Sequence, residues 1–94
     1  MQNATVIAKR FIISGAVQGV GYRYFARRAA RSCGVTGTVR NLPDGTVEAV
    51  AEGEERAVAD FRAELERGPS HGRVDRVVEE PVPTTGFDSF NVTY

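Results

Sequence analysis

A glycine-rich stretch between a strand-like segment and a helix-like segment most constrains this chain. Residues 15–23 read GAVQGVGYR and follow a run at 6–14 rich in Ile, Val and Phe, which indicates a buried strand. Residues 22–33 carry apolar side chains at helical spacing, and the glycine after them is a typical helix stop. A strand that enters a helix through glycines makes a loop that can turn sharply and aim backbone N–H groups at one point.

The rest of the chain continues the succession of strands and helices. Alternating side chains predict strands over 35–41 and 46–52, joined by the turn sequence LPDG. A second amphipathic helix is predicted over 54–67, an edge strand with prolines over 73–82, and a short alternating segment over 87–94. The order β-α-β-β-α-β predicts an α+β, ferredoxin-like sandwich: an antiparallel sheet of four to five strands with two helices on one face.

Composition limits the partners and the cell compartment that we expect for this chain. The chain has 94 residues, which predicts one domain over 1–94, and its 12 basic side chains are balanced by 12 acidic ones. Without a basic surplus we expect no nucleic-acid partner. A single cysteine, Cys33, allows no internal disulfide and fits a reducing compartment. Residues 1–9 lack the apolar core of a signal peptide and no apolar run could span a bilayer, so we expect a cytoplasmic protein with no membrane partner.

The glycine loop and the arginine after it have the chemistry of an anion site. Gly19 and Gly21 let successive backbone N–H groups converge, and the following helix adds its own free N–H groups and dipole. Arg23 adds a planar, permanent charge, so the parts together suit a tetrahedral dianion such as phosphate. The loop lacks the ending of a Walker A sequence and the spacing of a dinucleotide loop. On these residues alone, a plain turn before a solvated arginine stays open as the alternative.

Two stretches together resemble a known family. Residues 15–23 resemble the first signature of acylphosphatases, and GTVRNLPDGTV at 37–47, followed by Gly53, resembles the second. The internal spacing and the separation of the two stretches match, so the resemblance covers essentially the whole chain. Two positions depart from the family pattern: Thr38 stands where an aromatic residue is usual, and Tyr22 where phenylalanine or methionine is commoner. We expect Thr38 to alter packing on the outer face of the sheet more than the chemistry.

The resemblance implies a metal-independent acylphosphatase. Such an enzyme hydrolyses acyl phosphates, of the acetyl phosphate, carbamoyl phosphate or 1,3-bisphosphoglycerate type, to a carboxylate and inorganic phosphate. It implies that Arg23 holds the phosphoryl group and that Asn41 positions the attacking water. The implied phosphate-binding loop consists of Val17, Gln18, Gly19, Val20, Gly21, Tyr22 and Arg23. No cofactor is implied, phosphate or sulfate should bind as product or analogue, and we expect a monomer.

Other proteins with this order of elements give rival interpretations. An RNA recognition motif needs stacking aromatic residues on its central strands, and 46–52 has none. A copper carrier would need a CxxC pair, which one cysteine excludes. A carbamoyl-phosphate-handling module of a larger maturation protein stays open as an alternative, although the length of the chain disfavours it. We expect His71 to be a solvated loop residue, Cys33 a small core residue, and Arg27 and Arg31 part of a solvated helix face.

Overall fold

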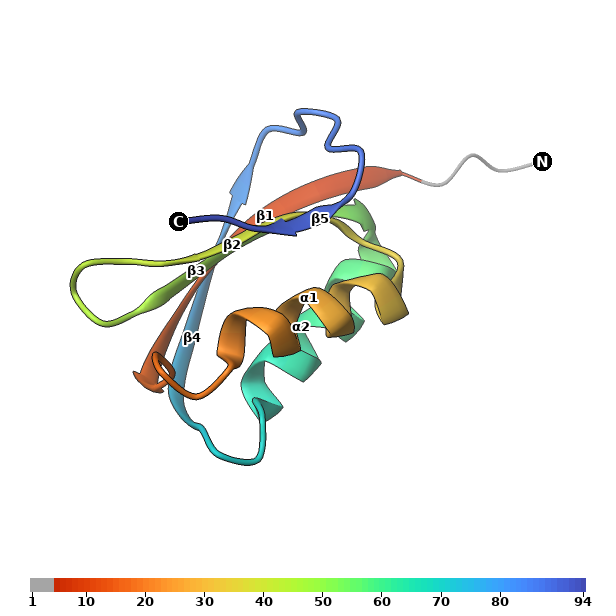
Figure 1. The fold of residues 1–94 in the computed structure, drawn as a ribbon. Coiled ribbons are helices and arrows are strands. Elements are labelled where there is room, and N and C mark those ends of the chain that lie inside the picture. Colours follow the sequence, from red (N-terminus) through yellow and green to blue (C-terminus); the bar gives the residue numbers. More distant parts are fainter. Residues whose placement is uncertain (1–4) are drawn as a thin grey trace.

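A five-stranded sheet with two helices makes up residues 5–94, which are the residues that the computed structural model describes. The elements in chain order are β1 (Val6–Ala16), α1 (Tyr22–Cys33), β2 (Thr36–Asn41), β3 (Val47–Glu54), α2 (Glu55–Arg67), β4 (Arg73–Val82) and β5 (Phe90–Val92). The strands lie in the order β4-β1-β3-β2-β5, and both helices lie on one side of the sheet (Figure 1). The predicted α+β, ferredoxin-like arrangement is confirmed.

The sheet is mixed, which corrects the prediction of a purely antiparallel one. β1 pairs antiparallel with β3 and with β4, and β2 pairs antiparallel with β3. The last strand, β5, runs parallel to β2, with Phe90 opposite Gly37. The segment after β4 crosses over one end of the sheet before β5 joins the opposite edge, so β5 starts from the same end as β2 (Figure 1).

Element boundaries follow the sequence pattern closely up to β4. Helix α1 and strand β4 begin and end where the pattern predicts, and the other bounds shift by at most two residues. β1 extends beyond its apolar run because Gly15 and Ala16 still pair with β4, after a change of register at Ser14. The final strand spans only Phe90–Val92 of the predicted segment 87–94.

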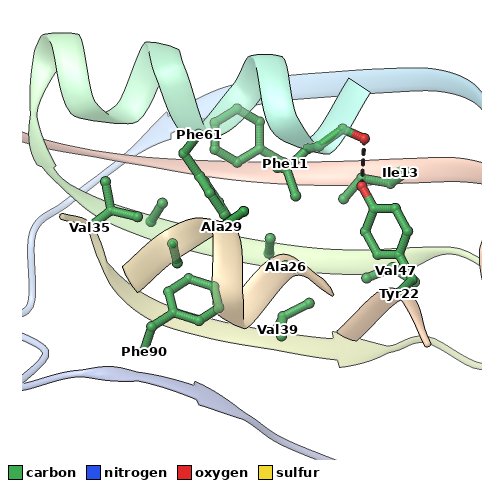
Figure 2. Packing of buried hydrophobic residues seen from close by; sticks show 14 of the residues in the cluster. Phe11, Ile13, Tyr22, Ala26, Ala29, Val35, Val39, Val47, Phe61 and Phe90 are labelled. Atoms are coloured by element: carbon green, nitrogen blue, oxygen red, sulfur yellow. Dashed lines mark hydrogen bonds between the residues drawn. The ribbon is translucent and has the colours of Figure 1, made fainter. Parts of the chain in front are cut away.

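The core lies between the helices and the inward face of the sheet (Figure 2). Phe61 of α2 packs its ring between Phe11 and Phe90, with ring centroids 6.1 and 5.4 Å away in edge-on contacts. The buried Tyr22 hydroxyl donates a hydrogen bond of 2.7 Å to the Leu65 carbonyl oxygen, which joins the start of α1 to the end of α2 (Figure 2). Burial raises the pKa of Tyr22 well above its ordinary value, so the hydroxyl keeps the proton that it donates.

The outward face of the sheet holds two buried carboxylates that the alternating pattern did not indicate. Glu48 accepts hydrogen bonds from Arg10 Nε at 2.6 Å and Arg40 Nε at 2.8 Å, so one side chain links three neighbouring strands. Glu52 accepts the backbone N–H groups of Thr85 and Gly86, which fastens the segment before β5 to β3. These partners allow both carboxylates to be buried in their charged form.

Candidate functional site

The loop between β1 and α1 turns through two glycines in left-handed conformation. Gly19 and Gly21 have φ angles of 76° and 77°, which L side chains rarely adopt. Within residues 5–94, no atom beyond the glycine and its two chain neighbours lies within 4 Å of where a Cβ would stand on either residue, so backbone direction and not crowding requires glycine. Val17 anchors the start of the loop in the core, and Gly21 is the N-cap of α1. The loop therefore leads straight into the first turn of the helix.

The N-terminal end of α1 has free hydrogen-bond donors. No side chain in the described part of the chain caps it, and the first helical bond runs from the Phe25 N–H to the Gly21 oxygen, at 3.0 Å. Within residues 5–94, the backbone N–H groups of residues 18–23 have no hydrogen-bond acceptor. Free N–H groups at the positive end of a helix dipole form a place where an anion is stabilised.

The side chain of Gln18 braces this loop against the β2–β3 turn. Its amide Nε2 donates to the Leu42 carbonyl oxygen at 2.8 Å and to the Thr46 carbonyl oxygen at 2.9 Å. The turn is itself closed by the Leu42 N–H bond to Thr46 and by the Asp44 carboxylate, which accepts the Thr46 N–H. Sequence analysis placed Gln18 in the loop but missed this brace, because its partners are backbone carbonyls that no residue pattern marks.

Arg23 and Asn41, which come from separate motifs, meet at one hollow of about 160 Å³, called here the anion hollow. Asn41 is the last residue of β2, and it stands two residues after the core residue Val39, on the same face of the sheet. The lining consists of Val17, Gly19, Gly21, Tyr22, Arg23, Tyr24 and Asn41.

Of the predicted loop residues, Gln18 and Val20 are not in this lining: Gln18 is turned to the β2–β3 turn and Val20 packs against the core. Thr38 is also not in the lining and pairs with Val50 and Asn91.

One atom of Asn41 lacks a partner. Among residues 5–94, its Oδ1 is the one buried side-chain oxygen or nitrogen without a hydrogen bond. Buried polar atoms are nearly always satisfied, and leaving one unsatisfied costs about 1–3 kcal/mol. Asn41 lines the anion hollow, so a small turn of its amide would bring Oδ1 to a water molecule held there.

Two tyrosines that sequence analysis did not single out stand beside Arg23. The Tyr94 ring lies over the guanidinium, with 4.8 Å from Cζ to the ring centroid, and Tyr24 lines the anion hollow. The pKa of Tyr94 is raised above its ordinary value, chiefly by hydrogen bonding with the Tyr24 side chain. None of the ion pairs formed within residues 5–94 involves Arg23, so its guanidinium fork is open to an anion.

The remaining candidates lie away from the anion hollow. His71 is exposed in the loop before β4, and Cys33 is half-buried at the end of α1. Burial raises the pKa of the Cys33 thiol, and the carboxylates of Asp60 and Glu64 add to this effect. The described part of the chain contains no cluster of three His, Cys, Asp or Glu side chains placed to hold a metal ion. Neither of its helices is long and apolar enough to cross a membrane.

Comparisons with known proteins agree on one family. The acylphosphatase family model matches residues 9–92. An acylphosphatase from Synechococcus sp. (strain CC9311) is 52% identical over 83 residues, which cover 88% of this chain and 92% of that protein. The structure of an acylphosphatase from Coxiella burnetii superposes with a TM-score of 0.92 at 32% identity, covering 99% of this chain and 100% of that one. The acylphosphatase from Bacillus subtilis gives a TM-score of 0.90 at 34% identity, covering 94% and 99%.

Proposed function

The chain belongs to the acylphosphatase family, and we propose that it hydrolyses acyl phosphates with Arg23 and the 17–23 loop holding the phosphoryl group and Asn41 placing the attacking water. Acyl phosphates of the acetyl phosphate, carbamoyl phosphate and 1,3-bisphosphoglycerate type share the phosphoryl end that this hollow would hold. The proposal includes a single domain over residues 1–94 that works in the cytoplasm as a monomer, without a metal or cofactor.

The unpartnered Asn41 oxygen is the observation that carries the proposal. It is buried, it belongs to a residue that lines the anion hollow, and the same hollow is lined by Arg23 and by loop glycines. A water that donates one hydrogen to Oδ1 has its lone pair directed away from the amide and toward the phosphorus of a bound substrate. A neutral amide does this without repelling a dianion, as a carboxylate would.

The chemistry then needs little beyond positioning and charge. The water oxygen bonds to phosphorus in line as the bond from phosphorus to the acyl oxygen breaks, and the electron pair leaves on the carboxylate. A proton of the water passes to a phosphate oxygen, so the products are a carboxylate and inorganic phosphate. Arg23 and the free N–H groups stabilise charge on the equatorial oxygens. A carboxylate is a weak base, so its departure needs no general acid.

A metal-free hydrolysis assay tests the proposal. Benzoyl phosphate should be hydrolysed in the presence of EDTA, and an alkyl phosphate monoester should be hydrolysed far more slowly, because an alkoxide leaving group would need an acid. Turnover of the monoester alone, or turnover only after a metal is added, would contradict the proposed reaction.

A further inference from the structure

Helix α1 has a charge pattern unlike that of the rest of the described chain. It carries Arg23, Arg27, Arg28 and Arg31 and no acidic residue. No carboxylate within residues 5–94 forms an ion pair with any of these four. Apart from Arg76, every other basic side chain does form one; these are Lys9, Arg10, Arg40, Arg56, Arg62, Arg67 and Arg73. Like charges three and four residues apart destabilise a helix, so this row needs another explanation than stability.

Tyr24 connects this row of arginines to the anion hollow. It lines that hollow, a second hollow of about 240 Å³ with Arg27, Arg28 and Arg31, and a third of about 590 Å³ between α1 and α2. Its side chain is 53% exposed, and the Arg27 guanidinium lies over the ring with 5.8 Å from Cζ to the centroid. Arg28 lines both of the outer hollows.

The dimensions suit an acyl group that leaves the anion hollow along the helix. At a rise of about 1.5 Å per residue, Arg28 starts about 7.5 Å beyond Arg23 along the axis of α1. A benzene ring or a chain of a few carbon atoms spans that length. Its first part would lie against the Tyr24 ring, and a charged group at its far end would reach the unpaired guanidinium groups.

We propose that the exposed face of α1 from Tyr24 to Arg31 is an acyl-group subsite that selects acyl phosphates bearing a second anionic group, a carboxylate or a phosphate, at the far end of the acyl part. The proposal rests on the proposed function, since the phosphoryl group must occupy the anion hollow. Tyr24 contacts the body of the acyl group, while Arg27, Arg28 and Arg31 contact the second anion.

Two substrates that differ at one position test the subsite. 4-Carboxybenzoyl phosphate carries a second anion on a rigid ring, and 4-methylbenzoyl phosphate is its neutral match in size. The measured quantity is the ratio of their kcat/KM values, each divided by the uncatalysed rate. Arg28→Gln should lower this ratio about threefold and the combined Arg27→Gln, Arg28→Gln and Arg31→Gln variant about tenfold, as expected for exposed charge contacts. The loss should lie in KM for the carboxylated substrate and should disappear at high salt.

Arg76→Gln is the matched control. Arg76 is exposed, lies on β4 and is also unpaired within residues 5–94, so its replacement changes the net charge equally without touching α1. A ratio unaffected by Arg28→Gln and by the combined variant, or lowered equally by Arg76→Gln, would overturn the subsite and leave the proposed reaction intact. The subsite would also be overturned if a single-stranded RNA bound the wild type but not Arg28→Gln, while the two proteins had the same ratio of kcat/KM values. In that case α1 would be a nucleic-acid-binding surface. Failure of the wild type to hydrolyse either substrate would instead overturn the proposed reaction.

Discussion

Asn41 retains a polar atom that would be expensive to bury without a role. Its Oδ1 forms no hydrogen bond within residues 5–94, and the residue ends β2 beside the loop and Arg23. A turn-entry asparagine would have its side chain bonded to the turn backbone, but in this turn Asp44 makes that bond. The side chain of Asn41 is therefore not one of the groups that hold this turn together.

Replacing Asn41 by alanine should separate chemistry from binding. Asn41→Ala should lower kcat by about 10²–10³-fold, the scale seen when one transition-state contact is lost. KM should change little and the melting temperature should not fall, because the removed oxygen contacts neither the phosphoryl group nor a hydrogen-bond donor of residues 5–94. Steady-state kinetics with benzoyl phosphate measure the split, and Asn91→Ala on the exposed side of β5 is the control that should keep full activity. A variant that lost phosphate binding and kept kcat would show that the roles are assigned wrongly.

Arg23 should behave in the opposite way, because it would contact the phosphoryl group before and during the reaction. Arg23→Ala should weaken phosphate binding and abolish turnover, and Arg23→Lys should restore little of either. An ammonium on a flexible stem has no planar fork to hold two oxygens or to lie under the Tyr94 ring. Phosphate titration by calorimetry beside kinetics measures both effects. Arg56→Lys, on the exposed face of α2, is the control. If Arg23→Lys recovered most of the activity, Arg23 would act only through its positive charge and not through its planar fork.

Some residues of the candidate site could be predicted from the sequence and others could not. Arg23, Asn41 and the two glycines could be predicted because each belongs to a motif with its own spacing. Three contacts could not be predicted. They are the Tyr94 ring over Arg23, the Tyr22 hydroxyl bond to Leu65, and the bond that the Gln18 amide donates to the β2–β3 turn. Each of these contacts joins residues far apart in the chain, and no periodicity reports such a distance.

At the scale of whole elements, the helices and the first four strands could be predicted because most of them repeat apolar side chains with the period of their own element. The direction of β5 could not, since alternating side chains look the same in a parallel and an antiparallel strand. The burial of Glu48 and Glu52 could not be predicted either, because carboxylates in an alternating strand pattern are normally assigned to the solvent-exposed face. Only the fold brings Arg10 and Arg40 to the two sides of Glu48.

Glu48 links β1, β2 and β3, and it should give the fold a dependence on acid pH. Burial alone would raise its pKa, but the hydrogen bonds and charges of Arg10 and Arg40 outweigh this and hold the pKa below its ordinary value. The unfolded chain then takes up the proton first as pH falls, so the stabilisation is complete at neutral pH and is lost below about pH 4.5. Glu48→Gln should cost about 1–3 kcal/mol at pH 7, and the difference from wild type should shrink toward pH 3.

Urea unfolding at several pH values measures this contribution. Asp88→Asn, at an exposed position before β5, is the control and should leave the unfolding midpoint nearly unchanged at pH 7. A Glu48→Gln variant whose deficit stayed constant down to pH 3 would show that Glu48 contributes by packing and not by charge.

For the molecule as a whole, inorganic phosphate should act as a stabilising ligand. It would bind only the folded anion hollow, so at a hundred times its Kd it should add about 2.7 kcal/mol to the free energy of unfolding. In a domain of this size each kcal/mol raises the melting temperature by about 4–8 °C. Sulfate should reproduce the shift and chloride at equal ionic strength should not. Thermal unfolding of wild type beside Arg23→Ala provides the test, and an equal shift in both proteins would place the anion elsewhere.

The brace made by Gln18 has a consequence for how the chain can change over evolutionary time. An exposed hairpin turn normally tolerates added or missing residues, because nothing else depends on its shape. Here both carbonyls that receive the Gln18 amide belong to the two ends of the β2–β3 turn. One inserted residue would move them apart and pull the loop away from Asn41. The turn is therefore expected to vary in residue type at Pro43 but to keep its length across lineages, as though it were buried.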